Sequence, residues 1–138
     1  MLIGNSRYDN CYSEGEYGNP NISFARYDKM SNALNATGRQ ILYGMCNWGQ
    51  DQPWQWANTI ANSFRVTGDI YDQFDRPDPR CPCVEKEGYF CQFTGYHCSV
   101  MNIIDKTVYF IHQSQPGAWN DLDMLEIGNV RFVLCICY

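Results

Sequence analysis

The sequence predicts an α/β fold built on a parallel sheet, because short apolar segments alternate with helical patterns along most of its length. Residues 40–46 form a compact uncharged run, as expected for a strand that is buried on both faces. Residues 24–34 instead repeat apolar side chains at intervals that suit one face of a helix. A length of 138 residues with 45% hydrophobic residues leaves room for one ordinary domain.

The first half of the chain provides three expected strands and two helices. A strand ends just before Asp9, and a helix with Gly38 as its stop follows. This helix carries on one face Phe24, Tyr27, Met30, Ala33 and Leu34. After the strand at 40–46, residues 53–61 predict a short helix with proline in its first turn. Residues 64–66 predict another strand, and Gly68 permits a sharp turn before Asp69.

The second half begins with a different composition. Residues 72–98 contain a charged, proline-rich stretch and then four cysteines, which indicates a disulfide-stapled insertion. After it, one expected helix leads to a new strand near Trp119. This helix carries Val100, Ile103, Ile104 and Val108.

The cysteines and the charge balance restrict the class of protein. Eight cysteines and the sequons at Asn21 and Asn35 favour a secreted protein in an oxidising setting, although no signal peptide is visible. The net charge of −5 argues against binding to nucleic acid or to anionic membranes. No apolar stretch is long enough to span a membrane.

Disulfides are favoured over a metal site in the cysteine-rich segment, because its closely spaced pair lacks the gap of a zinc knuckle. We expect the nested pairs Cys81–Cys98 and Cys83–Cys91, although four cysteines allow three connectivities. Neither a metal ion nor an organic cofactor is expected.

Two carboxylates stand at the ends of predicted strands, Asp9 and Asp69. A retaining glycosidase needs one ionised carboxylate and one protonated carboxyl group, with the two groups roughly 5–5.5 Å apart. On local sequence alone a structural role is favoured for both, because Asp9-Asn10 and Gly68-Asp69 are ordinary turn residues. Asp121 and Asp123 similarly indicate either a strand end at a site or the start of a helix.

Several strings, in order along residues 8 to 129, resemble those of the melibiase-type α-galactosidases, particularly the fungal branch. They are Tyr8-Asp9-Asn10-Cys11-Tyr12, Thr37-Gly38-Arg39, Cys46-Asn47-Trp48-Gly49, Phe64-Arg65-Val66-Thr67-Gly68-Asp69-Ile70, Gln115-Pro116-Gly117-Ala118-Trp119-Asn120-Asp121-Leu122-Asp123-Met124-Leu125 and Ile127-Gly128-Asn129. The resemblance implies a (β/α)8 TIM barrel of which this chain covers roughly strands 4 to 7. It also implies retaining hydrolysis of terminal α-galactosyl residues from oligosaccharides or galactomannan.

The motif match also implies roles for single residues. Asp9 would be the nucleophile, Asp69 the acid/base, and Arg65 a contact to both the sugar and Asp69. The remaining substrate-binding positions would be Arg7, Cys46 and Trp48, of which the last two crowd the 2-hydroxyl, and Met124 as an apolar wall. Asp121 and Asp123 would support their strand end.

The chain also departs from the family pattern. The family usually has Lys where this chain has Arg7, and a planar guanidinium does not replace an ammonium neutrally. The first three strands and the usual partner of Cys11 are missing, and residues 130–138 have no counterpart. We therefore expect one partial barrel domain over residues 1–138, with self-association through exposed strand edges. The alternative is an inactive remnant that binds sugar weakly or associates with itself.

Overall fold

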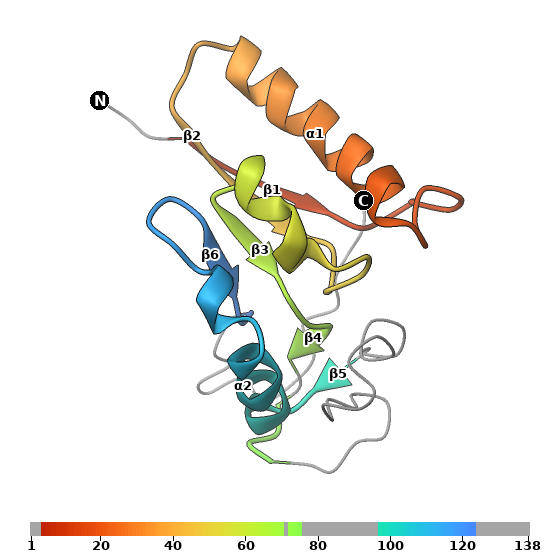
Figure 1. Cartoon of the computed structure of the whole chain (residues 1–138), viewed down its shortest axis with the longest axis vertical. Coiled ribbons are helices and arrows are strands. Elements are labelled where there is room, and N and C mark those ends of the chain that lie inside the picture. Colours follow the sequence, from red (N-terminus) through yellow and green to blue (C-terminus); the bar gives the residue numbers. More distant parts are fainter. Residues whose placement is uncertain (1–3, 71, 76–96, 124–138) are drawn as a thin grey trace.

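The computed structural model describes residues 4–70, 72–75 and 97–123, and its main sheet has four parallel strands. They are β1 (Gly4–Asp9), β2 (Ile41–Cys46), β3 (Ser63–Arg65) and β6 (Trp119–Asp121). The strands lie side by side in the order β1-β2-β3-β6 (Figure 1). The predicted parallel α/β sheet is therefore confirmed.

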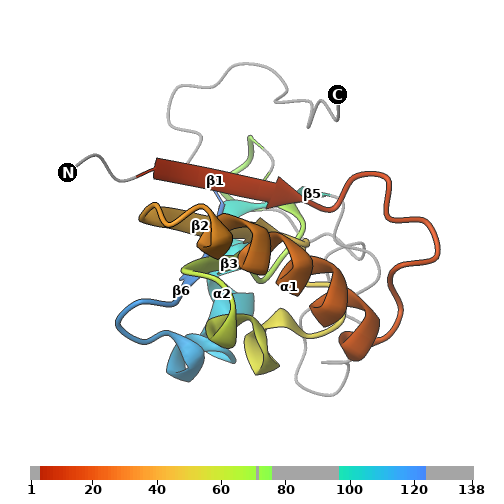
Figure 2. The same ribbon diagram turned by 90° about the horizontal axis from the view of Figure 1, so that it is seen from above.

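Helix α1 (Pro20–Ala36) connects β1 to β2 and lies along both strands (Figures 1 and 2). It begins after Asn19, whose side-chain oxygen accepts a hydrogen bond from the N–H of Asn21 at 2.8 Å. Pro20 occupies the first turn, where no backbone donor is required. The helix ends shortly before Gly38, whose φ of +67° suits glycine. The predicted helix and its stop are both confirmed.

The buried face of α1 is more polar than predicted. Tyr27 is fully buried, and Met30 and Leu34 pack against the core around it. Ala33, which belongs to the same predicted apolar face, is exposed. Three polar residues of the helix are buried, namely Ser23, Arg26 and Ser31. Each hydrogen-bonds a group outside the helix, which offsets the cost of burying it.

The core lies between α1 and one face of the sheet. The buried side chains of Tyr43, Met45 and Phe64 belong to it, and the rings of Tyr8 and Tyr27 meet edge to face at 5.2 Å. Figure 2 shows α1 packed on this side of β1 and β2.

The opposite face of the sheet is less covered, and we call it the open face. Leu42 on β2 and Trp119 on β6 belong to it, and they are 51% and 54% exposed. The prediction that residues 40–46 are buried on both faces was therefore wrong for the first part of β2.

Residues 53–61 form two short 3₁₀ turns in place of the predicted helix. Trp56, with a φ of −139°, separates η1 (Pro53–Gln55) from η2 (Ala57–Thr59). The indole N–H of Trp56 donates to the carbonyl oxygen of Asp51 at 2.8 Å, and its ring packs edge-on against Phe24 of α1. These contacts hold Trp56 in a backbone conformation that a continuous helix does not allow.

A second, two-stranded parallel sheet pairs β4 (Asp69–Ile70) with β5 (His97–Cys98). The core of the predicted insertion at 72–98 and the off-pattern tail at 130–138 lie outside the described residues, and so do Cys81, Cys83 and Cys91 of the proposed cysteine pairs. Cys11 and Cys98 are both disulfide-bonded. The sulfur of Cys11 is therefore not free.

Helix α2 (Val100–Val108) leads through η5 (Ile111–Gln113) to β6, as predicted. Ser99 and Asn102 form a reciprocal capping box at its start. All four predicted apolar residues lie on this helix; Ile103 is 1% exposed, whereas Ile104 and Val108 are 44% and 60% exposed. The two lie four residues apart on one outward face. Within the described ranges, no helix has the length and apolarity to cross a membrane.

Candidate active site

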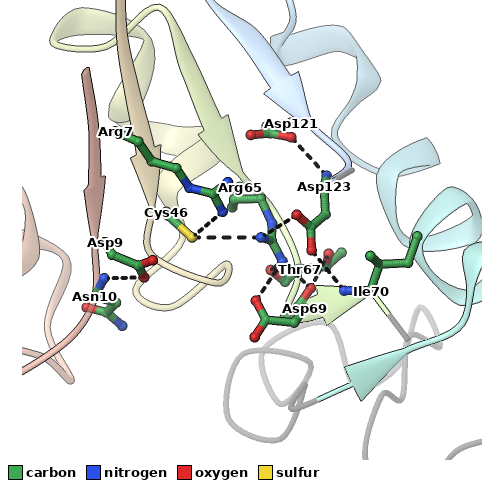
Figure 3. Close-up of polar contacts among 11 residues, drawn as sticks. Arg7, Asp9, Asn10, Cys46, Arg65, Thr67, Asp69, Ile70, Asp121 and Asp123 are labelled. Atoms are coloured by element: carbon green, nitrogen blue, oxygen red, sulfur yellow. Dashed lines mark hydrogen bonds and ion pairs between the residues drawn. The ribbon is translucent and has the colours of Figure 1, made fainter. Parts of the chain in front are cut away.

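Reactive side chains form one row across the carboxyl end of the main sheet. In the strand register, Asp9 of β1 is opposite Cys46 of β2, and Arg65 of β3 is opposite Asp121 of β6. Because the strands are parallel, the four residues leave the sheet at the same end. Figure 3 shows how motifs from distant parts of the chain meet there.

Arg65 is the centre of this row and is only 1% exposed. Its Nη2 donates to the carbonyl oxygen of Gly68 at 2.6 Å and to Oδ1 of Asp69 at 3.2 Å. Its Nη1 lies 2.9 Å from Oδ1 of Asp123. A buried guanidinium requires such partners because its charge has lost its hydration. One cation therefore holds two carboxylates that come from different strand ends.

Cys46 ends β2 as a fully buried free thiol. Its Sγ accepts hydrogen bonds from Nη2 of Arg7 at 2.9 Å and from Nη1 of Arg65 at 3.7 Å. Burial raises the pKa of Cys46 to about 11, although both guanidinium groups act against that shift. The thiol is therefore neutral at physiological pH, and it anchors two arginines.

Asp69 lies at the start of β4, with 28% of its side chain exposed. Burial raises the pKa of this carboxyl group, and Arg65 acts in the opposite direction. The negative charges of Asp123 and Asp9 raise the pKa further. A carboxyl group that retains its proton to higher pH is suited to general acid catalysis.

Asp9 is followed by a buried polar cluster that no sequence pattern indicated. Its Oδ1 accepts a hydrogen bond from the N–H of Asn10 at 2.7 Å. The side chain of Asn10 donates to Gln50 at 2.7 Å and accepts hydrogen bonds from Arg26 and Tyr27 of α1. Asn10 is only 3% exposed. It thus connects the end of β1 to α1 and to the loop after β2, which is more than a solvent-exposed turn residue does.

The turn after β2 fixes the position of Trp48. Trp48 and Gly49 have φ values of +59° and +76°. A Cβ at Gly49 would lie 2.3 Å from the carbonyl oxygen of Val66, so only glycine fits. The indole Nε1 of Trp48 is buried and has no hydrogen-bond partner in the described part of the chain.

The structure brings most of the predicted site residues to this end of the sheet. Arg65 contacts Asp69, and Arg7 contacts Cys46, while Asp9 acts on Asp69 through its charge. Met124 lies outside the described residues. Among the residues described, no group of three or more His, Cys, Asp or Glu side chains could hold a metal ion.

Sequence reasoning missed the direct contact between Asp123 and Arg65. Asp123 was expected only to support its strand end, and its spacing from Asp121 was the available signal. The structure adds an ion pair and a left-handed backbone with a φ of +72°.

Comparison with known sequences identifies yeast α-galactosidases as relatives. The chain is 57% identical over 122 residues to an α-galactosidase from Lachancea cidri, and 52% identical over 122 residues to α-galactosidase 5 from Saccharomyces cerevisiae. Each match covers 88% of this chain and 26% of the relative. The chain therefore spans about a quarter of the length of the curated relatives it matches. No protein-family model matches the chain.

Solved structures agree with the sequence comparison. The crystal structure of α-galactosidase I from Mortierella vinacea matches with a TM-score of 0.82 and 54% identity, over 92% of this chain and 31% of that chain. The α-galactosidase from Saccharomyces cerevisiae matches with a TM-score of 0.83 and 48% identity, over 94% of this chain and 28% of that chain. By sequence and by structure, the chain is therefore similar to fungal α-galactosidases, over roughly a quarter to a third of their length.

Proposed function

We propose that the chain carries the two catalytic carboxylates of a retaining α-galactosidase, and that its main sheet represents strands 4 to 7 of a (β/α)8 barrel. In barrels of this kind the site lies at the carboxyl ends of the strands. The reactive row of this chain lies at that end of its sheet. The substrate class would be terminal α-galactosides of oligosaccharides or galactomannan. A related structure from Saccharomyces cerevisiae was solved with raffinose.

In the proposed mechanism Asp9 attacks the anomeric carbon of the galactosyl unit. The bond from that carbon to the leaving oxygen breaks, and Asp69 gives its proton to this oxygen. Asp69, now ionised, then takes a proton from water while the water oxygen attacks the same carbon and releases Asp9. The two inversions retain the configuration, and the steps require neither a metal nor an organic cofactor.

The observation that carries the proposal is the environment of Asp69. Burial and two neighbouring carboxylates favour its protonated form, and one of these carboxylates belongs to Asp9. A protonated acid within the electrostatic reach of a second carboxylate is the arrangement that retaining cleavage uses.

The other proposed site residues would shape the sugar pocket. Arg7 is exposed and its guanidinium is held by Cys46, so it can extend from the sheet toward a hydroxyl group. Cys46 and Trp48 would restrict the space at the 2-position, and Met124 would add an apolar wall. The terminal nitrogens of the buried Arg65 already contact protein groups, so we expect it to hold Asp69 more than to bind sugar.

The setting of the proposed enzyme is extracellular. The disulfide-bonded state of Cys11 and Cys98 supports an oxidising compartment. The sequons at Asn21 and Asn35 fit the same setting, and both asparagines are exposed. The cysteine-rich segment at 72–98 would be a stapled insertion, as in the fungal branch.

The alternative is an inactive remnant that binds α-galactosides weakly or associates with itself. The half-exposed Leu42 and Trp119 on the open face favour self-association.

Release of nitrophenol from an aryl α-galactoside tests the proposal. We expect measurable release by the purified chain, with α-galactose as the first product seen by NMR. Asp9→Asn should reduce release to the level without protein. Asp105→Asn, which removes an exposed carboxylate from α2, is the matched control and should leave the rate unchanged. A folded wild-type chain that releases nothing at high concentration would exclude activity and favour the remnant.

A further inference from the structure

We propose that Asp123 is a positioning residue that shares the guanidinium of Arg65 with Asp69 and fixes the strand that carries Asp69. The inference rests on the proposed acid/base role of Asp69. Asp123 follows β6 and Asp69 starts β4, so the two residues come from different sheets. Their side chains lie on either side of Arg65 (Figure 3).

The first observation is how the guanidinium of Arg65 is shared. Asp123 lies 2.9 Å from Nη1, and Asp69 lies 3.2 Å from Nη2. The side chain of Asp123 is 8% exposed, compared with 28% for Asp69. The shorter and less hydrated contact is the stronger one electrostatically. Asp123 therefore offsets part of the effect by which Arg65 lowers the pKa of Asp69.

The second observation is a backbone contact from the same carboxylate. Oδ2 of Asp123 accepts a hydrogen bond at 2.9 Å from the N–H of Ile70, the residue directly after Asp69. One carboxylate thus holds Arg65 with one oxygen and the short strand β4 with the other. This contact fixes where Asp69 stands relative to the end of β6.

The third observation is that the conformation of Asp123 is itself held in place. Its φ of +72° is in the left-handed region, which costs a non-glycine residue energy. The N–H of Asp123 donates to Oδ1 of Asp121 at 2.8 Å, and this hydrogen bond closes the turn. A turn of this kind suits Asp or Asn, so replacement by Asn tests the charge without changing the preferred backbone.

Charged groups from three elements act on Asp69. Arg65 on β3 lowers its pKa, while Asp123 after β6 and Asp9 on β1 raise it. On β5, His97 is opposite Asp69 in the strand register. Removing the charge of Asp123 leaves Asp69 without a competing carboxylate at the guanidinium of Arg65. It also removes the repulsion between the negative charges of Asp123 and Asp69. Both changes favour the ionised form of Asp69.

The test is an NMR titration of the side-chain carboxyl carbon of Asp69. Asp123→Asn should lower the apparent pKa of Asp69 by about one unit, the lower end of what a neighbouring charge does. Asp121→Asn is the matched control. It also removes a carboxylate and keeps the acceptor for Asp123, and it should leave the Asp69 curve in place.

An unchanged or raised pKa of Asp69 in a folded Asp123→Asn variant would overturn the proposal, as would an equal shift in Asp121→Asn. If Asp123→Asn does not fold, the wild-type curves decide. Coupling to a neighbouring carboxylate gives the Asp69 curve a second inflection, whereas a single-step curve for Asp69 would contradict the inference. The titration needs no turnover, so a chain without α-galactosidase activity can still pass or fail it.

Discussion

At the scale of single residues, the candidate site is organised by two arginines and the groups that hold them. Arg65 contacts Asp69 and Asp123, while Arg7 and Arg65 both donate to the sulfur of Cys46. The neutral thiol can accept these hydrogen bonds without adding a charge to a site that already holds several carboxylates. The geometry therefore explains a buried cysteine without any nucleophilic role.

The first prediction concerns the reactivity of Cys46. Since burial raises its pKa to about 11, only about one thiol in a thousand is ionised at pH 8. We expect slow alkylation by iodoacetamide at pH 8 and faster alkylation as the pH approaches 11. The measurement is mass spectrometry of the peptide that contains Cys46, which separates it from the other cysteines.

The same pKa shift has a consequence for stability. The folded chain holds the proton of Cys46 more tightly than the unfolded chain, so this contribution is complete below about pH 9. It is lost as the pH rises toward about 11. Rapid labelling of Cys46 at pH 7 in the folded chain would contradict both the burial and the shift.

The residues of the candidate site could be predicted from the sequence only where they stand in a recognisable motif. Asp9, Asp69 and Arg65 stand in ordered strings, and the structure brings them to one end of the sheet. The burial of Asn10 was not predictable, because its partners come from α1 and from the loop after β2. Contacts of this kind depend on the tertiary structure, which the local pattern does not contain.

At the scale of elements, the loops that follow the strands determine where the site residues stand. The loop after β2 has several residues with positive φ, and it packs against the end of β3 at Val66. Helix α1 was predictable because its period, proline start and glycine stop all agree. Residues 53–61 were not, because the contacts of Trp56 override the helical pattern.

Gly49→Ala is the prediction that belongs to this scale. The added Cβ would meet the Val66 carbonyl oxygen at 2.3 Å, so the loop after β2 must move away from β3. Left-handed alanine costs about 1 kcal/mol, and the clash should add about 2 kcal/mol or more to the loss of unfolding free energy. Urea denaturation measures the sum.

Gly15→Ala provides the control for this prediction. Gly15 has a similar φ of +80°, and nothing lies within 4 Å of the position its Cβ would take. It should therefore lose only the conformational part, about 1 kcal/mol. Equal losses in the two variants would show that the loop after β2 is not packed against Val66 as described.

At the scale of the whole molecule, the sheet is covered on one side and open on the other. In the described residues, β1 and β6 each pair with a single neighbouring strand, so each leaves one edge of backbone groups for pairing. The open face adds the half-exposed side chains of Leu42 and Trp119. The parallel arrangement of the strands was predictable from the alternation of strands and helices. The exposure of Leu42 was not, because it depends on which parts of β2 other elements cover.

The last prediction is that the isolated chain associates with itself through this open face. Sedimentation at tens of micromolar should give species larger than the 16.0 kDa monomer. Leu42→Lys combined with Trp119→Lys should shift the population toward monomer, because burying a lysine charge in an interface is unfavourable. Ile22→Lys is the control, since Ile22 is 43% exposed on α1, away from the open face. A monomeric wild-type chain would contradict the prediction. Equal dissociation of the Ile22→Lys variant would show that the association does not depend on the open face.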